Sequence, residues 1–163
     1  MIAINEILAA WARERPDLDA SPMGVIGRLA RVAAKLDSEI SADHARYGLD
    51  AGSFDVLFTL VRSGAPYSLS PSALAASSMV TTAAVAQRLN RLDAAGLIRR
   101  EPNPDDARGR IVTLTPEGKA LADRALPTHL VAEESFLAPL DSDQRALLSE
   151  LLDRLLGDGS ARR

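Results

Sequence analysis

Residues 70–114 read SPSALAASSMVTTAAVAQRLNRLDAAGLIRREPNPDDARGRIVTL, and this stretch decides the fold. It begins with a short Ala-rich run that predicts one helix, and a second predicted helix follows over 81–92. Gly96 then ends the helical pattern, and two β-like runs, 97–101 and 110–114, flank a turn-rich segment. The order helix, turn, helix, hairpin predicts a winged helix-turn-helix, a module whose second helix docks in the major groove of DNA.

The second predicted helix has two chemically different faces. Its apolar stripe recurs at the spacing of one inward face: Val85, Leu89, Leu92 and Gly96. The opposite face carries groups that can approach and read base edges: Ala83, Gln87, Asn90 and Arg91. Thr81 is a predicted N-cap, and the free N–H groups beside it suit a phosphate. An ordinary amphipathic helix has the same pattern, so the hairpin that follows decides in favour of DNA binding.

The turn-rich segment between the two β-like runs predicts a wing. An Arg on such a projecting loop can enter a narrow minor groove, and a nearby Asp can hold its guanidinium in place. We therefore predict an Asp106–Arg108 ion pair in the wing; the alternative is a surface pair of little energetic consequence. The complete set of predicted DNA-contacting residues is Thr81, Thr82, Ala83, Gln87, Asn90, Arg91, Arg108 and Arg110.

Composition restricts the class of protein. The chain has 163 residues, enough for one domain, and no cysteine, which excludes disulfides and thiol catalysis. Its two histidines, His44 and His129, have no ligand-like spacing, so we expect neither a metal nor a cofactor. The net charge is −3, yet residues 88–110 hold six arginines against four acids, which favours one basic face on an acidic body. No membrane span or signal peptide is recognisable, so we expect a cytoplasmic protein.

The remaining segments predict helices on both sides of this module, so the fold class is mainly α with a small β wing. We expect an N-terminal helical arm over 1–19, dimerisation helices over 20–47 and 115–158, and a DNA-binding lobe over 50–114, all within a single domain spanning 1–163. Pro127 is predicted to kink or interrupt the helix that contains it. The last helix carries a leucine-rich stripe: Leu147, Leu148, Leu151, Leu152, Leu155 and Leu156. Together with the first long helix, this stripe predicts a homodimer, and a different protein partner is the alternative.

The chain resembles the multiple-antibiotic-resistance regulator (MarR) family of dimeric bacterial transcription factors. Residues 91–100 (RLDAAGLIRR) and the wing run 106–118 (DARGRIVTLTPEG) carry this resemblance. Residues 10–19, 23–29 and 54–57 are similar to the family branch that responds to urate and related anions and has an additional N-terminal helix. That resemblance implies a ligand site made by Trp11, Asp55 and Arg88.

The residues themselves leave other roles open for these three side chains. Trp11 is the only tryptophan, and it can serve simply to anchor the N-terminal arm by burial. Asp55 is either placed favourably near the positive end of its helix or is a partly buried carboxylate that needs a cationic partner. Arg88 lies at the flank of the inward stripe, where it can reach towards Asp55 or extend beside the core.

Together these features predict a ligand-responsive DNA-binding transcriptional regulator. We expect a repressor that is released from a palindromic operator by a small aromatic or carboxylate anion, with urate as one candidate. The alternative is a constitutive architectural DNA-binding protein without an effector. An enzyme is not expected, because no nucleophile elbow, phosphate loop or acid/base cluster is recognisable in the sequence.

Overall fold

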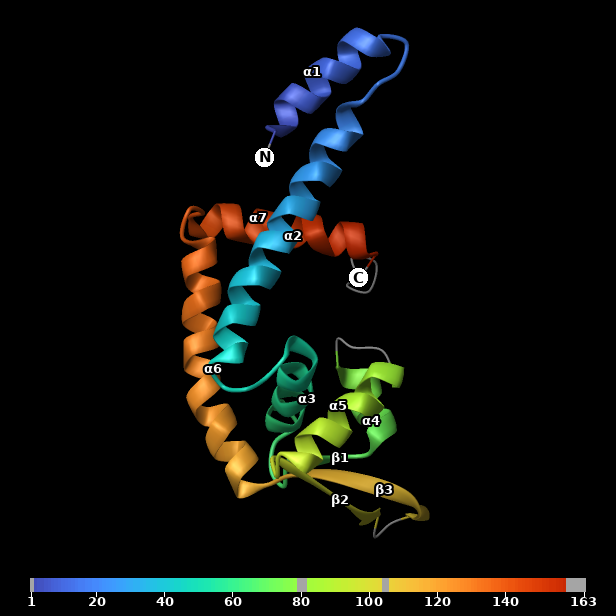
Figure 1. Ribbon diagram of the computed structural model, residues 1–163, viewed down its shortest axis with the longest axis vertical. Helices are drawn as coiled ribbons and strands as arrows, with labels where there is room; N and C mark the ends of the chain where they lie inside the picture. Colours follow the sequence, from blue (N-terminus) through green and yellow to red (C-terminus); the bar gives the residue numbers. More distant parts are fainter. Residues whose placement is uncertain (1, 79–81, 104–105, 158–163) are drawn as a thin grey trace. The chain divides into compact units, whose positions relative to one another are not determined.

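The computed structural model describes residues 2–78, 82–103 and 106–157 (Figure 1). It is mainly helical, with one small sheet, as predicted. The elements in chain order are α1 (Ile4–Glu14), α2 (Ser21–Ala45), α3 (Ala51–Arg62), β1 (Ser68–Leu69), α4 (Pro71–Ser77), α5 (Thr82–Ala94), β2 (Ile98–Asn103), β3 (Asp106–Leu114), α6 (Pro116–Leu137) and α7 (Ser142–Leu156). The chain forms two compact units, Met1–Ala42 and Asp43–Arg163. Within the described ranges, no helix is long and apolar enough to cross a membrane.

The first unit is a pair of helices joined by a short connection. Its first helix, α1, packs closely on the first turns of α2 at two glycines. A Cβ added at Gly24 would lie 3.0 Å from Leu8 Cδ1, and one added at Gly27 would lie 2.9 Å from Ile4 Cδ1. The two helices therefore approach each other closely at Gly24 and Gly27, because glycine has no side chain to keep them apart.

The second unit is built around α3. Seven of its twelve residues are buried, in agreement with a helix that is apolar nearly all round. Asp50 is the N-cap of α3, as its position before the helix predicts, and its Oδ1 accepts from the Ser53 N–H at 2.8 Å. The core includes side chains from α3 itself and from α4, α5, β2, β3 and α6: Leu57, Leu60, Leu74, Val85, Leu89, Leu92, Ile98, Val112 and Ala125.

The winged helix-turn-helix is confirmed. Ser70 caps α4 through the Ala73 N–H, and the inward stripe of α5 is buried as expected, with Leu92 only 2 % exposed. Gly96 ends the segment after α5 with a φ of 69°, a left-handed conformation that glycine adopts without strain. The strands of the wing are longer than predicted. A third strand, β1, was not predicted; it pairs antiparallel with β3, giving the order β1-β3-β2.

The run Thr115-Pro116-Glu117-Gly118 fastens α6 to the end of the DNA-binding lobe. Thr115 Oγ1 donates to the Gly96 carbonyl at 2.7 Å and accepts from the Gly118 N–H at 3.0 Å, so one hydroxyl caps α6 and holds the turn after α5. A Cβ added at Gly118 would lie 2.0 Å from the Leu97 carbonyl oxygen. The glycine is therefore needed for a close backbone approach between α6 and the start of the hairpin.

The C-terminal part of the described chain consists of the helices α6 and α7. Pro127 does not interrupt α6, which is one continuous helix from Pro116 to Leu137. The helix persists because its neighbours on both sides of the proline are held: Ala125 is fully buried, and Thr128 Oγ1 donates to the Ala125 carbonyl at 3.0 Å. A capping box begins α7, with reciprocal bonds between Asp141 and Gln144.

Candidate nucleic-acid interface

The polar face of α5 is exposed, while its apolar face is buried in the second unit. Gln87, Asn90 and Arg91 lie on the exposed side, as the helical phase predicts. Thr81 lies outside the described residues, as do the side chains of Thr82 and Ala83. The part of α5 whose side chains are described therefore presents two amides and a guanidinium to solvent, which are the groups that bind base edges in the major groove.

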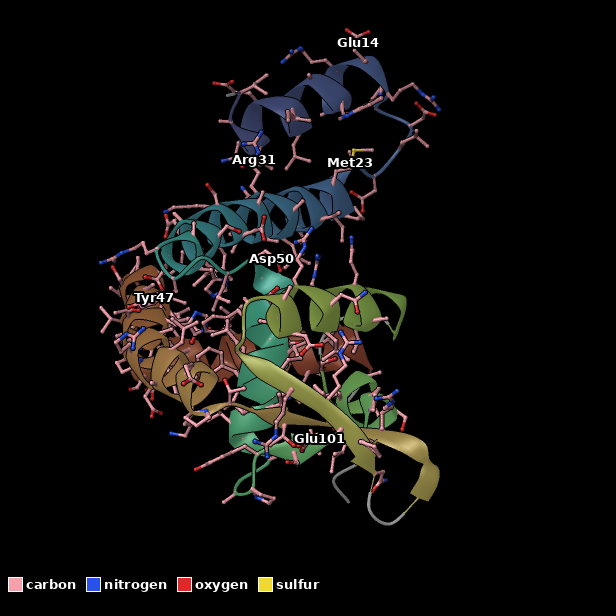
Figure 2. The ribbon with its side chains drawn as sticks, turned by 60° about the horizontal axis from the view of Figure 1, so that its bottom comes forward. Glu14, Met23, Arg31, Tyr47, Asp50 and Glu101 are labelled. Carbon is pink, nitrogen blue, oxygen red and sulfur yellow. The ribbon has the colours of Figure 1, made fainter. Side chains whose placement is uncertain are left out.

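The carboxylate of Asp50, which lies at the start of α3 (Figure 2), contacts two arginines of α5. Asp50 Oδ2 lies 3.4 Å from Arg88 Nη1 and also accepts a hydrogen bond from Arg91 Nη1. Because Arg88 and Arg91 are three residues apart, both project from the same side of α5 towards Asp50. The side chain of Arg88 is 24 % exposed and that of Arg91 57 %, so Arg88 is the inner and Arg91 the outer partner.

The side chain of the inner arginine, Arg88, occupies the space beside Gly52 of α3. A Cβ added at Gly52 would lie 2.4 Å from Arg88 Nε, so any larger residue there would displace the guanidinium. Arg88 Nε itself is buried and has no hydrogen-bond partner among the described residues. The position of Arg88 therefore depends on Gly52 for space and on Asp50 for charge.

Asp50 stays ionised in this arrangement. Partial burial acts to raise its pKa, but the hydrogen bonds from Ser53 and the positive charges of Arg88 and Arg91 outweigh that effect, and the pKa lies below its ordinary value of 3.8. The carboxylate thus has two functions at once, as a helix cap and as the counter-ion of two arginines.

The adjacent side of α5 is tied to the wing. Asn90 Oδ1 accepts from Arg100 Nη2 at 2.6 Å, and Arg100 Nε lies 3.5 Å from Asp93 Oδ2. Arg100 is on β2, so these contacts fix the first wing strand against the helix. The oxygen of Asn90 is engaged within the protein, which leaves its amide N–H groups for a contact with DNA.

The wing carries Arg110, which is exposed and pairs across the hairpin with Pro102. Asp106 and Arg108 belong to β3, but their side chains lie outside the described residues, so the predicted Asp106–Arg108 ion pair stays a prediction.

The three predicted effector residues fall in different units. Trp11 is on α1 in the first unit, where it lines a hollow of about 330 Å³ with Arg15, Leu18, Asp19, Ala20 and Met23. Asp55 and Arg88 belong to the second unit, and Asp55 is half-buried on α3. The acid that the structure pairs with Arg88 is Asp50, five residues before Asp55. The sequence around Asp50 indicates a helix cap but gives no sign of its contact with Arg88, because 38 positions separate the two residues.

The two histidines, which the sequence pattern does not relate, lie in contact. Although 85 residues separate them, His44 Nε2 and His129 Nδ1 lie 3.3 Å apart, and the His44 ring stacks on Phe54 with centroids at 3.8 Å. Burial and the neighbouring His129 lower the pKa of His44 below its ordinary value of 6.5. The described part of the chain contains no cluster of three or more His, Cys, Asp or Glu side chains that could hold a metal ion.

Known proteins resemble this chain over most of its length. A family model described as "MarR family" matches residues 47–109. The regulator PecS of Dickeya dadantii is 39% identical over 154 residues, which cover 94% of this chain and 93% of that protein. Two solved structures also have folds similar to that of this chain. Sco3205 of Streptomyces coelicolor, solved in complex with DNA, has a TM-score of 0.78 and 25% identity and covers 89% of this chain and 91% of that one.

The second solved structure is BpsR of Bordetella bronchiseptica, whose DNA binding is regulated by 6-hydroxynicotinic acid. Its TM-score is 0.70 at 26% identity, over 80% of this chain and 97% of that one. Identity to PecS along almost the whole of both chains adds the helices outside 47–109 to the match. On this evidence, together with the winged helix-turn-helix, the protein belongs to the MarR family of transcriptional regulators.

Proposed function

We propose that this protein is a repressor that binds a palindromic operator through α5 and the wing and leaves it when a small anion binds. The observation that carries the proposal is the division of α5: its apolar stripe is buried while Gln87, Asn90 and Arg91 remain exposed. The exposed Arg110 on β3 adds a positive charge on the adjacent hairpin. A helix that reads base edges beside a hairpin that contacts the backbone or minor groove accounts for both features.

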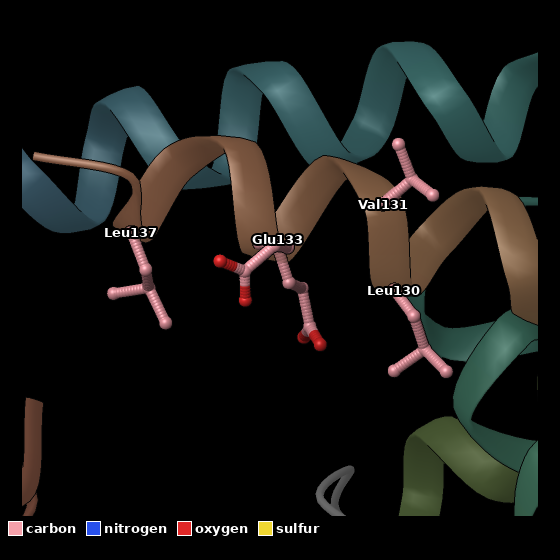
Figure 3. A pocket seen from close by; sticks show the side chains of 5 residues that line it. Leu130, Val131, Glu133 and Leu137 are labelled. Carbon is pink, nitrogen blue, oxygen red and sulfur yellow. The ribbon is translucent and has the colours of Figure 1, made fainter. Parts of the chain in front are cut away.

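The operator is proposed to be palindromic because we expect the protein to act as a homodimer. Five leucines of α7 are exposed: Leu147, Leu148, Leu151, Leu155 and Leu156. On α6, Leu130 and Leu137 project from the same side and line a groove of about 470 Å³ (Figure 3). Exposed apolar side chains in such number are typical of a subunit interface, and a two-fold dimer presents two copies of α5 to successive major grooves.

The proposed effector is a small aromatic or carboxylate anion, with urate as one candidate. The proposal is supported by the similarity of residues 10–19, 23–29 and 54–57 to the urate-responsive branch, and BpsR responds to an aromatic carboxylate. Trp11 would supply a stacking face, Arg88 a bidentate donor, and Asp55 a hydrogen bond if it is protonated. An anion that binds Arg88 would compete with Asp50 for the guanidinium. Because Arg88 belongs to α5, effector binding would weaken the contact that joins this DNA-reading helix to α3.

The test begins by selecting the preferred duplex from a random DNA library and measuring its affinity by fluorescence anisotropy. Urate, xanthine and 6-hydroxynicotinic acid are then titrated by calorimetry with and without this duplex. We expect one of the anions to lower DNA affinity by the same factor by which DNA lowers the affinity for the anion. Failure to select any DNA contradicts the proposal, and DNA binding that no anion alters favours a constitutive architectural protein.

A further inference from the structure

We infer that Asp50 is a positioning residue for DNA recognition: it holds Arg88 and Arg91 of α5 and restricts Arg91 to sequence-selective contacts. The inference rests on the proposed function, in that α5 must be the helix that reads DNA. It adds a residue that lies on neither the reading helix nor the wing. A helix cap does not need an arginine partner, so capping alone does not explain why Asp50 contacts two arginines.

The first step is that the Asp50 carboxylate has more partners than capping needs. The cap uses Oδ1, which accepts from the Ser53 N–H at 2.8 Å. The other oxygen, Oδ2, points to α5 and receives both arginines. The Asp50 side chain therefore caps α3 through one oxygen and binds the two arginines of α5 through the other.

The second step concerns the inner arginine, Arg88, which holds α5 against the start of α3. Arg88 passes so close to α3 that Gly52 cannot carry a side chain without moving it. A guanidinium confined in this way, with a carboxylate 3.4 Å from its Nη1, fixes the rotation of α5 about its own axis relative to α3. The same rotation decides which residues of α5 point to the base edges.

The third step concerns the outer arginine, which is mostly exposed and can bind a phosphate or a base edge as well as Asp50. While Asp50 is ionised, a non-specific phosphate must compete with a carboxylate already in contact with Arg91. Only a duplex that offers additional contacts to α5 compensates for the loss of that pair. Asp50 thus lowers affinity for arbitrary DNA more than affinity for the operator, which raises discrimination.

The experiment separates this role from helix capping. Asp50→Ser keeps a strong N-cap but removes the charge that holds the arginines, whereas Asp50→Ala removes both. Glu117→Gln, at an exposed position in the first turn of α6, is the matched control for the loss of one negative charge. Anisotropy titrations over a salt series measure the affinity of each variant for the selected operator and for a scrambled duplex, and thermal unfolding measures stability.

For Asp50→Ser we expect a smaller loss of stability than for Asp50→Ala, a rise in affinity for the scrambled duplex, and a loss of discrimination of about tenfold, the size of one lost base contact. The slope of log affinity against log salt should become steeper by about 0.9 on the scrambled duplex, since Arg91 is free to bind one further phosphate. Combining the change with Arg91→Gln should abolish both effects if Asp50 acts through Arg91. Glu117→Gln should leave discrimination and slope unchanged.

The inference is overturned if Asp50→Ser discriminates as the parent does, or if only Asp50→Ala differs from it, since capping alone then explains the residue. It is also overturned if Glu117→Gln has the same effect as Asp50→Ser, because general charge is then responsible. A parent protein that selects no DNA refutes the proposed function instead, and the two failures are distinguished by the parent's own titration.

Discussion

His44 Nε2 lies 3.3 Å from His129 Nδ1, and this contact joins the end of α2 to the middle of α6. The His44 ring stacks on Phe54 of α3, and its Nδ1 is buried without a hydrogen-bond partner among the described residues. On its other side, His129 Nε2 lies 3.1 Å from Glu133 Oε1. Burial in this contact disfavours the charged form of His44 and lowers its pKa.

The first prediction is a loss of stability in mild acid. Burial and His129 lower the pKa of His44 in the folded state, against the smaller opposing effects of Asp43 and Asp50, so the unfolded chain binds the proton more readily. The contribution of neutral His44 to the free energy of unfolding is therefore fully present above its ordinary pKa of 6.5, and it is lost as the pH falls below that value. Melting temperatures between pH 5.5 and 8 should show this decline, and His44→Gln should flatten it. Parallel profiles for the two proteins would exclude His44 as the cause.

A second prediction concerns the close approach at Gly118. Gly118→Ala would place a Cβ 2.0 Å from the Leu97 carbonyl oxygen, so α6 or the turn after α5 must shift. We expect a loss of about 1–3 kcal/mol in the free energy of unfolding, the usual cost of overpacking. Urea denaturation measures it, with the exposed neighbouring change Glu117→Ala as a control that should stay within about 0.5 kcal/mol. Equal effects of both changes would mean that the close approach to the Leu97 carbonyl does not explain the need for glycine at position 118.

The third prediction tests the proposed subunit interface. Leu151 is on α7 and 44% exposed, so Leu151→Glu should leave the core of the second unit intact. In a dimer it would bury a charge without a partner, and we expect the dimer to dissociate at micromolar concentration. Sedimentation equilibrium of the parent and the variant measures this, and Asp143→Asn at the start of α7 is the control. A folded monomeric parent would contradict the homodimer proposal.

A fourth prediction separates the wing from the reading helix. Arg108→Ala should weaken binding to the operator and to scrambled DNA alike and reduce the salt slope by about 0.9, because one phosphate or minor-groove contact is lost. Gln87→Ala should instead change the preferred sequence, because its amide is placed to read a base edge. Salt-dependent anisotropy and a repeated selection measure the two effects. If Arg108→Ala binds as the parent does across the salt series, the wing does not contact DNA as proposed.

The last prediction concerns the effector. Trp11→Phe should weaken binding of the responsive anion, because the smaller ring offers less stacking area, while ligand-free DNA binding stays at the level of the parent. Arg88→Ala should weaken anion binding more strongly, since a bidentate donor is removed. Calorimetry measures both affinities. If the anion binds equally well to the parent and to Trp11→Phe, the aromatic side chain of α1 takes no part in the site.

The local pattern of the sequence determined the helices, the cap at Asp50 and the inward stripe of α5. These features depend on residues within a few positions of one another, so periodicity and capping chemistry are sufficient to predict them. The run after the wing also indicated a helix start at Thr115. The continuity of α6 through Pro127 was not predictable in this way, because it depends on Ala125 being buried in the core.

Only the tertiary structure decided which distant side chains meet. Asp50 and Arg91 are separated by 41 positions and His44 and His129 by 85, and no periodicity within a helix relates either pair. Strand β1 is likewise too short to be recognised alone, and it exists because β3 supplies its hydrogen-bonding partner. Helical phase placed Arg88 beside the core, but the packing of α5 against α3 selected Asp50, with Gly52 leaving the space, as the place where its charge is neutralised.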